Sequence, residues 1–306
     1  MITSNSVKIA LGTVQFGLPY GIANQTGKVT RPVANAMLQL AAANGIDTLD
    51  TAIAYGESET CLGEVGSQGF KLVTKLPAVP GGCVDVSDWV QEQVTGSLSR
   101  LGVNAVYGLL LHRPQQLLES GGEAIYQVLQ ELKKTGQVQK VGVSVYAPGE
   151  LEALIPRYRF DLVQAPFNLL DRRLQTSGWL QRLKDEGVEI HTRSAFLQGL
   201  LLMPQSTIPE EFAAWSELWR AWHEWLEQSE LTPLQACLRY ALSFSQISKV
   251  IVGVDNLPQL NAILVAATGP LPQIPDALST SDLALINPVN WVRSPNLATP
   301  TKASSL

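Results

Sequence analysis

Short apolar runs alternate along the chain with longer stretches of helical periodicity. Most of the apolar runs are continuous, a pattern typical of strands buried on both faces of a parallel sheet. They predict strands at Lys8–Thr13, Asp47–Ala52, Lys71–Leu76, Ala105–His112, Val138–Val145, Asp161–Phe167, Val188–Ser194 and Lys249–Val254. The stretches between them predict helices at Arg31–Asn44, Ser58–Val65, Ser87–Leu101, Gly122–Thr135, Pro148–Tyr158, Ser177–Glu186, Thr232–Ser243 and Leu257–Ala267.

Eight strand-then-helix units without a linker predict one α/β domain over residues 1–306, a (β/α)8 TIM barrel with its core at about 8–268. An open doubly wound sheet is the alternative, but LGTVQFGLPYG after the first strand lacks the GxGxxG of dinucleotide-binding sheets. The stretch Leu200–Glu230 is too long for an ordinary loop and predicts a helical insertion after the seventh strand. The tail at 270–306 is rich in Pro, Ser, Thr and Asn, which predicts irregular structure.

Residues in the insertion and at the ends of two predicted helices allow more specific predictions. The insertion carries four tryptophans. Spacing of three or four residues among the tryptophans favours packing in the core over a place in a substrate pocket. Asn44 followed by glycine predicts the end of the first long helix, and Ser87 predicts the N-cap of the third. Tyr20 and Trp291 are candidate pocket walls.

Composition and charge narrow the functional classes. The chain has 306 residues, of which 45% are hydrophobic and 16% are charged, with a net charge of −5. This balance offers no electrostatic basis for binding nucleic acid or an anionic membrane surface. Cys61, Cys83 and Cys237 are odd in number and lack metal-ligand spacing, so we expect neither a disulfide framework nor a metal site. With no apolar stretch of signal-peptide or membrane-span length, we expect a soluble, cytoplasmic protein.

Several predicted strands end in polar or ionisable residues. The second ends with Asp50 and is followed, after a short turn, by Tyr55; the third delivers Lys75 and the fourth His112. Alone, each is more often a cap, rim or core residue. In a barrel, however, the carboxyl ends of the strands form the working face, and several buried strands ending in ionisable groups are costly without partners. Together these residues predict an active site.

These strings resemble the aldo-keto reductases. The resemblance runs from LGTVQFG through GIDTLDTAIAYGESE, KLVTK, LLLHRP, VGVS, LVQAPFNLLDRR and FLQGLL to VIVGVDNLPQL, over roughly residues 8–265. It implies reduction of a small aldehyde or ketone by NAD(P)H on a TIM barrel. The family's catalytic tetrad then falls on Asp50, Tyr55, Lys75 and His112, with Tyr55 as the proton donor.

The tetrad has a physical rationale. A free tyrosine, with a pKa near ~10, is a weak acid at neutral pH. An ammonium ~4 Å away contributes about 4 kcal/mol at an effective dielectric of ~20, or roughly three pKa units at most. We therefore expect Lys75 to lower the pKa of Tyr55, and Asp50 to keep Lys75 charged while cancelling part of its field. His112 would hydrogen-bond the substrate oxygen.

The resemblance also implies a cofactor site that is usually filled by NADPH. Its positions fall on Gly12, Thr13, Asp50, Ser144, Gln164, Arg193, Gly253, Asp255, Asn256 and Gln259. Three features depart from the family pattern. Val145 stands where an asparagine is usual, Arg193 stands where an aromatic residue stacks on the nicotinamide, and the basic residues that hold the 2′-phosphate are missing near Asp255. A carboxylate there would repel a 2′-phosphate but accept a ribose hydroxyl, so NADH becomes possible. Alternatively, Asp255 caps the following helix.

Two other functions stay open at this point. One is a sensor or scaffold that binds the nicotinamide cofactor with little turnover. The other is a lyase or aldolase that uses Lys75 to form a Schiff base. The loop at 17–27, the insertion and the tail would select the substrate. The sequence indicates neither the substrate nor an oligomeric partner.

Overall fold

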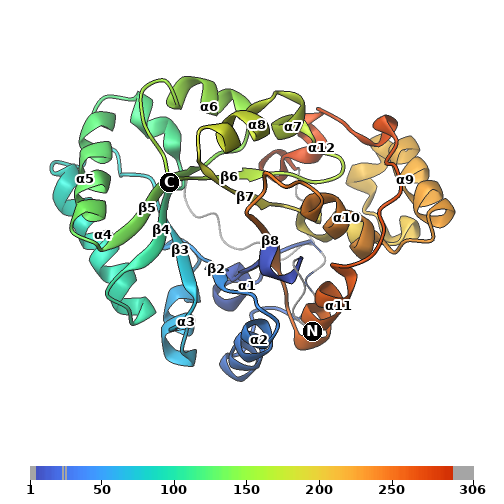
Figure 1. Ribbon diagram of the computed structural model, residues 1–306, viewed down its shortest axis with the longest axis horizontal. Coiled ribbons are helices and arrows are strands. Elements are labelled where there is room, and N and C mark those ends of the chain that lie inside the picture. The colour runs from blue at the N-terminus through green and yellow to red at the C-terminus, as the bar shows by residue number, and fades with distance from the viewer. Residues whose placement is uncertain (1–4, 23, 25, 292–306) are drawn as a thin grey trace.

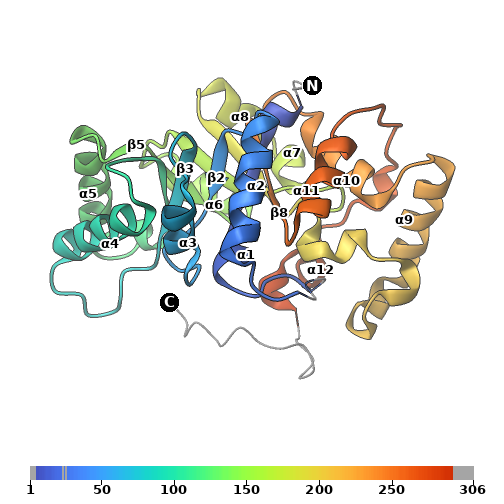
Figure 2. The same ribbon diagram turned by 90° about the horizontal axis from the view of Figure 1, so that it is seen from below.

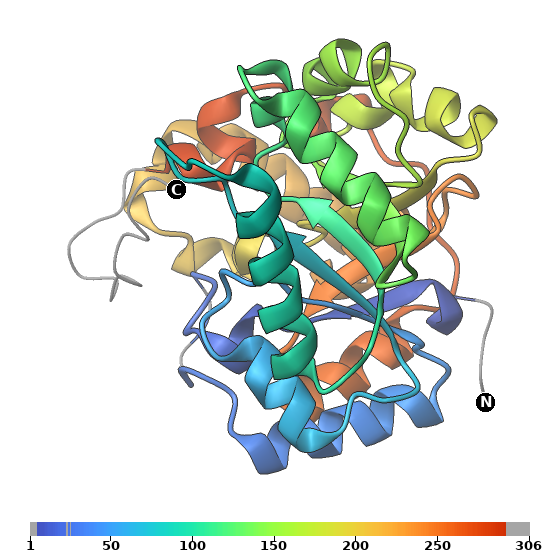
Figure 3. The same cartoon turned by 90° about the vertical axis from the view of Figure 1, so that its left-hand side faces the viewer.

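The computed structural model describes residues 5–22, 24 and 26–291. Eight parallel strands close into one barrel, in chain order, with β1 paired to β8 (Figure 1). Helices surround the strands, and α4 and α5 cover one flank side by side (Figure 3). The predicted (β/α)8 barrel is confirmed. The open sheet is excluded because its two edge strands would be unpaired.

The strands lie within the predicted ranges and are slightly shorter than most of them. They are β1 Ile9–Gly12, β2 Thr48–Asp50, β3 Lys71–Leu76, β4 Val106–Leu111, β5 Val138–Ser144, β6 Leu162–Pro166, β7 Glu189–Arg193 and β8 Lys249–Gly253. Every residue of β1, β2 and β6 is buried, as the continuous apolar runs predict. The ends differ because an apolar run marks burial, whereas a strand ends where its hydrogen-bond pairing ends.

The helices are α1 Val14–Gly17, α2 Arg31–Ala43, α3 Ser58–Val65, α4 Val86–Leu101, α5 Gly122–Lys134, α6 Pro148–Leu154, α7 Arg173–Thr176, α8 Trp179–Asp185, α9 Ser216–Gln228, α10 Pro233–Leu242, α11 Leu257–Ala266 and α12 Leu283–Ile286. The end of α2 is as predicted: Asn44 is its C-cap and the following glycine has φ 80°. The prediction of Ser87 as the N-cap of α4 is wrong. Asp85 fills that position and accepts a hydrogen bond from the amide of Asp88 at 2.9 Å.

The insertion after β7 contains short 3₁₀ turns and then α9, which lies at the end of the molecule opposite α4 and α5 (Figure 2). Trp219, Trp222 and Trp225 on α9 are buried. The rings of Trp222 and Trp225 stack with centroids 5.7 Å apart. The prediction that these tryptophans pack in the core is therefore confirmed.

The tail is fastened to the barrel by main-chain groups. It contains α12 and two 3₁₀ turns, and is otherwise irregular up to residue 291; residues 292–306 lie outside the described part. The amide of Thr280 donates to the carbonyl of Leu170 at 2.9 Å. The indole of Trp225 donates to the carbonyl of Gln273 at 3.2 Å. A hydrogen bond thus joins the insertion to the tail.

The barrel interior has a polar base beneath an apolar layer. Val73, Leu110 and Leu162 form a small buried cluster inside the barrel. Near the amino ends of the strands, Glu189 accepts a hydrogen bond from the hydroxyl of Tyr107 at 2.6 Å and pairs with Lys140. Since the apolar layer separates this base from the opposite end, polar groups at the carboxyl ends form a separate group.

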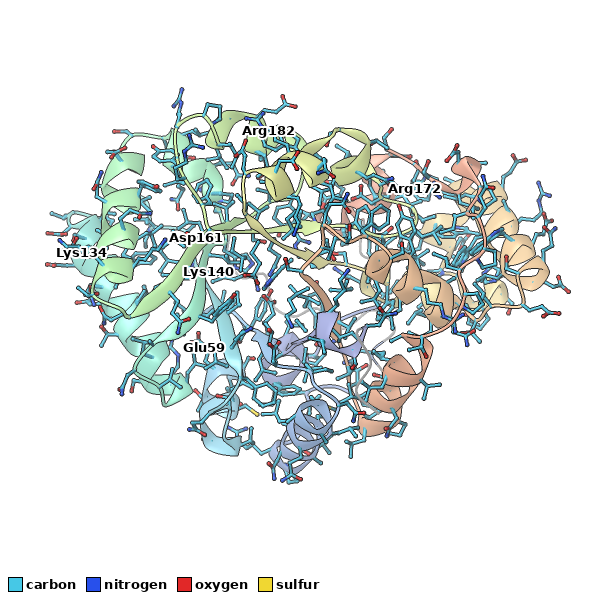
Figure 4. The ribbon with its side chains drawn as sticks, viewed as in Figure 1. Glu59, Lys134, Lys140, Asp161, Arg172 and Arg182 are labelled. Carbon is cyan, nitrogen blue, oxygen red and sulfur yellow. The ribbon has the colours of Figure 1, made fainter. Side chains whose placement is uncertain are left out.

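A buried carboxylate ties α3 to its neighbours. Glu59, on α3, is 1% exposed and lies between α3 and the strands (Figure 4). It accepts hydrogen bonds from the hydroxyls of Thr74 on β3 and Ser97 on α4, both at 2.6 Å. The guanidinium of Arg100 on α4 also pairs with it, at 2.8 Å. One carboxylate therefore joins three elements.

Asp47 is expected to make the free energy of unfolding depend on pH in the acid range. This half-buried carboxylate pairs with Lys249 and, at 3.0 Å, with Lys71. Burial raises its pKa, but hydrogen bonds from Lys249, Thr48 and Lys71 outweigh that effect and lower it to about 2. A depressed folded-state pKa adds stability above the unfolded value near ~3.9, which is lost as the pH falls towards 2.

Asp47→Asn should therefore flatten the dependence of unfolding free energy on pH between about 4 and 2. Urea unfolding at a series of pH values measures this. Asp185→Asn, which changes an exposed carboxylate on α8, is the matched control and should keep the slope. An unchanged slope in Asp47→Asn would contradict the expectation.

No helix in the described part of the chain combines the length and the apolar character needed to cross a membrane.

Candidate active site

A cavity of about 450 Å³ opens at the carboxyl ends of the strands. Asp50, Tyr55, Lys75 and His112 all line it. They come from β2, the turn after β2, β3 and the residue after β4. Parallel strands bring their carboxyl ends to one side of the barrel, so residues distant in sequence meet here. The four predicted catalytic residues are thus brought together.

Lys75 and Asp50 form a buried ion pair. The ammonium nitrogen of Lys75 lies 2.7 Å from Oδ2 of Asp50 and donates to the carbonyl of Thr51 at 2.9 Å. The other carboxylate oxygen of Asp50 accepts from Nε2 of Gln164 at 2.7 Å. Burial lowers the pKa of Lys75, and Asp50 partly offsets this by attraction and hydrogen bonding. The carboxylate thus holds the ammonium in place, as the sequence predicts.

Tyr55 lies within reach of the ion pair and of His112. Nζ of Lys75 is 5.1 Å from the centroid of the Tyr55 ring. The rings of Tyr55 and His112 meet edge to face, with centroids 5.9 Å apart at 75°. The phenol, the ammonium and the imidazole therefore share one region of the cavity.

The expected acidification of Tyr55 is wrong for this structure. Burial raises the pKa of the phenol well above its usual range, and Asp50 raises it further, while Arg193 lowers it. Lys75 is not among the groups that shift it. Taking the phenol out of water favours its neutral form. Tyr55 is consequently fully protonated at neutral pH.

His112 is neutral. Burial, followed by the charges of Lys75 and Arg193, lowers its pKa to about 3. Its main-chain amide donates to the carbonyl of Leu76 at 3.0 Å, which fixes the residue at the end of β4. A neutral imidazole has one N–H to donate and one nitrogen that accepts. His112 can therefore donate a hydrogen bond to a carbonyl oxygen at any pH near neutrality.

The predicted carboxamide-binding residues stand beside the tetrad. Ser144 ends β5 and pairs in register with Gln164 on β6, and the hydroxyl of Ser144 lies 3.5 Å from Oε1 of Gln164. Arg193 ends β7, in register with Pro166. All three polar side chains line the cavity. Strands β5, β6 and β7, which carry them, follow the tetrad-bearing strands β2, β3 and β4 around the barrel.

Glycines at the ends of β1 and β8 leave room for neighbouring protein side chains. Gly12 and Gly253 face each other in register. A Cβ on Gly253 would lie 2.5 Å from Nε2 of Gln15, and one on Gly12 would lie 3.1 Å from Ile251. Oε1 of Gln15 is buried and has no hydrogen-bond partner among the described residues. A buried amide oxygen without a partner is unfavourable and fits a site that a polar ligand completes.

Gln15 was missed from sequence. The pattern that could have indicated it is a glutamine between apolar residues in the segment VQF, which follows the first buried strand and forms the start of α1. Thr13, which was predicted, lines the cavity, but its hydroxyl also donates to the carbonyl of Asp50 at 3.0 Å. Thr13 therefore joins β1 to β2 in addition to facing the cavity.

Asp255 does not cap α11. Asn256 is the N-cap and accepts from the amide of Gln259 at 2.9 Å, and Asn256 is not among the cavity-lining residues. Asp255 instead accepts from Nδ2 of Asn24 at 2.8 Å and lies 3.4 Å from Nε2 of Gln259. Asp255 and Gln259 both line the cavity. The helix-capping alternative for Asp255 is wrong, since a contact from a distant loop holds this carboxylate.

Some of the residues considered as pocket walls line the cavity and others do not. Tyr20 lines it and accepts a hydrogen bond from Gln198 at 3.2 Å. Gln198 belongs to the start of the insertion, where Ser194, Leu197 and Gln198 all have positive φ. Such conformations are unfavourable for residues other than glycine and often occur at binding sites. Within the described chain, neither the tryptophans of α9 nor Trp291 line this cavity.

Known proteins resemble this chain in sequence or in fold. Aldo-keto reductase str7 from Strobilurus tenacellus is 30% identical over 184 residues, 58% of this chain and 54% of str7, so the chain spans about half of that relative's length. The aldo-keto reductase AKR11C1 from Bacillus halodurans superposes in its holo form with a TM-score of 0.70 at 20% identity, covering 87% of this chain and 88% of that one. Its apo form gives 0.65 at 21% identity, over 82% and 85%.

At these identities the superpositions show a common fold. The sequence model of the Aldo/keto reductase family matches residues 8–274, which contain the whole barrel and every residue of the tetrad. The chain belongs to the aldo/keto reductase family.

Proposed function

We propose that the protein reduces an aldehyde or ketone to an alcohol, with NAD(P)H as the hydride donor and Tyr55 as the proton donor. Membership of the family supports oxidoreductase chemistry on carbonyl compounds. The single observation that carries the proposal is the meeting of Tyr55, His112 and the Lys75–Asp50 pair in one cavity. Ser144, Gln164 and Oε1 of Gln15, which has no partner among the described residues, fit a nicotinamide dinucleotide beside them.

Each side chain has a distinct task. The cofactor, when bound, supplies the hydride to the carbonyl carbon. Tyr55 and neutral His112 bind the carbonyl oxygen and orient it. Tyr55 then gives its proton to the alkoxide oxygen that forms, since an alkoxide is a stronger base than a phenolate. Arg193, which lowers the pKa of Tyr55, favours the resulting phenolate, while Asp50 holds the Lys75 ammonium near the phenol ring.

A panel of carbonyl compounds tests the proposal. Sugars, short aldehydes, quinones and pyridoxal are each incubated with the protein and either NADPH or NADH, and cofactor consumption is followed by absorbance. We expect saturable consumption with at least one compound. Binding of the cofactor without turnover of any compound would instead support a sensor or scaffold.

Preference for NADPH over NADH is expected to be weak. Lys75 and Arg193 are the only cations among the described residues that line the cavity, and Lys75 is paired with Asp50. Asp255 would repel a 2′-phosphate. Equilibrium titration should give Kd values that differ by less than about a hundredfold. Asp255→Asn should shift the ratio towards NADPH; a hundredfold preference for NADPH in the unchanged protein would contradict the role of Asp255.

A further inference from the structure

Arg193 brings an uncompensated positive charge into the cavity. Its guanidinium is half-buried and donates to the carbonyl of Val145 at 3.1 Å and to the hydroxyl of Ser194 at 3.3 Å. It lies over the ring of Tyr146, 4.5 Å from the centroid. Among the described residues, no carboxylate lies within ion-pair distance of it. These neutral partners fix the position of the guanidinium and do not neutralise its positive charge.

The surrounding charges do not cancel it. The opposite charges of Lys75 and Asp50, 2.7 Å apart, sum to zero, and burial keeps His112 neutral. Arg193 lowers the pKa of Tyr55, of Lys75 and of His112, so its field reaches these three members of the tetrad. Asp255 also lines the cavity but is hydrogen-bonded to Asn24 and is not among the groups that act on the tetrad.

We propose that Arg193 makes the site bind the reduced nicotinamide cofactor more tightly than the oxidised one. The inference rests on the proposed function. The two forms are nearly the same molecule, but the oxidised ring carries a positive charge and the reduced ring is neutral. Ser144 ends β5, and Gln164 lies on β6, which pairs with both β5 and β7, so a carboxamide bound to them places its ring towards Arg193 on β7. A guanidinium stacks well on a neutral ring and repels a cationic one.

The preference has consequences for turnover. Repulsion between like charges in contact, at an effective dielectric of ~20, weakens binding by about tenfold or more. A tenfold ratio of dissociation constants raises the two-electron midpoint potential of the bound cofactor by about 30 mV. Arg193 therefore disfavours hydride transfer, which creates the cationic ring, and speeds release of the oxidised product.

Equilibrium titration of intrinsic tryptophan fluorescence tests this without turnover. Kd is measured for the oxidised and the reduced form of the same cofactor in the unchanged protein, in Arg193→Gln and in Arg193→Lys. We expect a ratio of oxidised to reduced Kd of at least about ten. It should fall severalfold in Arg193→Gln and persist in Arg193→Lys, which keeps the charge. Stopped-flow release of the oxidised form should slow in Arg193→Gln.

The outcomes separate this inference from the proposed function. If both forms bind and the ratio is the same in Arg193→Gln as in the unchanged protein, the role of Arg193 is overturned and the proposed function stands. If neither form binds the unchanged protein, both fail. Should Arg193→Gln not fold, an equal affinity of the unchanged protein for the two forms still overturns the inference.

Discussion

Tyr55→Phe is expected to lower kcat for carbonyl reduction by about 10²- to 10⁴-fold, the usual contribution of a positioned general acid. The substitution removes the phenolic proton and keeps the ring that packs against His112. The Lys75–Asp50 pair does not involve the phenol, so the site should retain its shape. Steady-state kinetics measures the loss. The Kd of the reduced cofactor should change little.

Tyr20→Phe is the matched control, since it removes a second hydroxyl from the same cavity. It should lower kcat by less than about tenfold, because a hydrogen bond to substrate or protein contributes less than proton transfer. If Tyr55→Phe kept most of the activity and Tyr20→Phe lost it, the assignment of the proton donor would be wrong. Circular dichroism and thermal unfolding check that both variants fold.

Glu59→Ala is expected to lower the free energy of unfolding by about 2–6 kcal/mol, since two buried hydroxyls are left without their acceptor at about 1–3 kcal/mol each. The carboxylate is 1% exposed. Its loss leaves the buried hydroxyls of Thr74 and Ser97 and the Arg100 guanidinium without their shared acceptor. Three elements would lose a common contact. Denaturant unfolding at equilibrium measures the change.

Glu64→Ala, on the same helix, provides the comparison. Glu64 pairs with Arg31, but both side chains are largely exposed, at 51% and 41%. Exposed pairs contribute about 0–1 kcal/mol, so this variant should unfold almost as the unchanged protein does. Glu59→Gln should lie between the two, since an amide oxygen still accepts from a hydroxyl. Equal losses in Glu59→Ala and Glu64→Ala would contradict the role given to burial.

Much of the fold was predictable because it depends on local pattern. Continuous apolar runs mark strands that are buried on both faces, and their number and order predict a barrel. The tetrad followed, because each of its members lies at or just after the end of such a run. Helix starts were less predictable. Ser87 and Asp85 are both good capping residues, and only the backbone conformation at Asp85 decides between them.

Some features of the site depend on contacts that no local pattern contains. The side chain of Asn24 donates to the carboxylate of Asp255, 231 residues away in the chain. Asp255 therefore links two loops instead of capping α11. Gln15 became a candidate ligand-binding residue only because Gly253, on the last strand, leaves space for its amide. Partial removal of Tyr55 from water in the cavity reversed the expected shift of its pKa.

The order of strands and helices, and the residue types at the strand ends, were thus determined by the sequence alone. Those properties arise from the burial of apolar side chains over a few neighbouring positions. Closure of β1 against β8, the protonation of Tyr55 and the exposure of the Arg193 charge to the cavity were decided by the tertiary structure. Desolvation and electrostatic interactions act through space, between groups that the chain brings together only when it is folded.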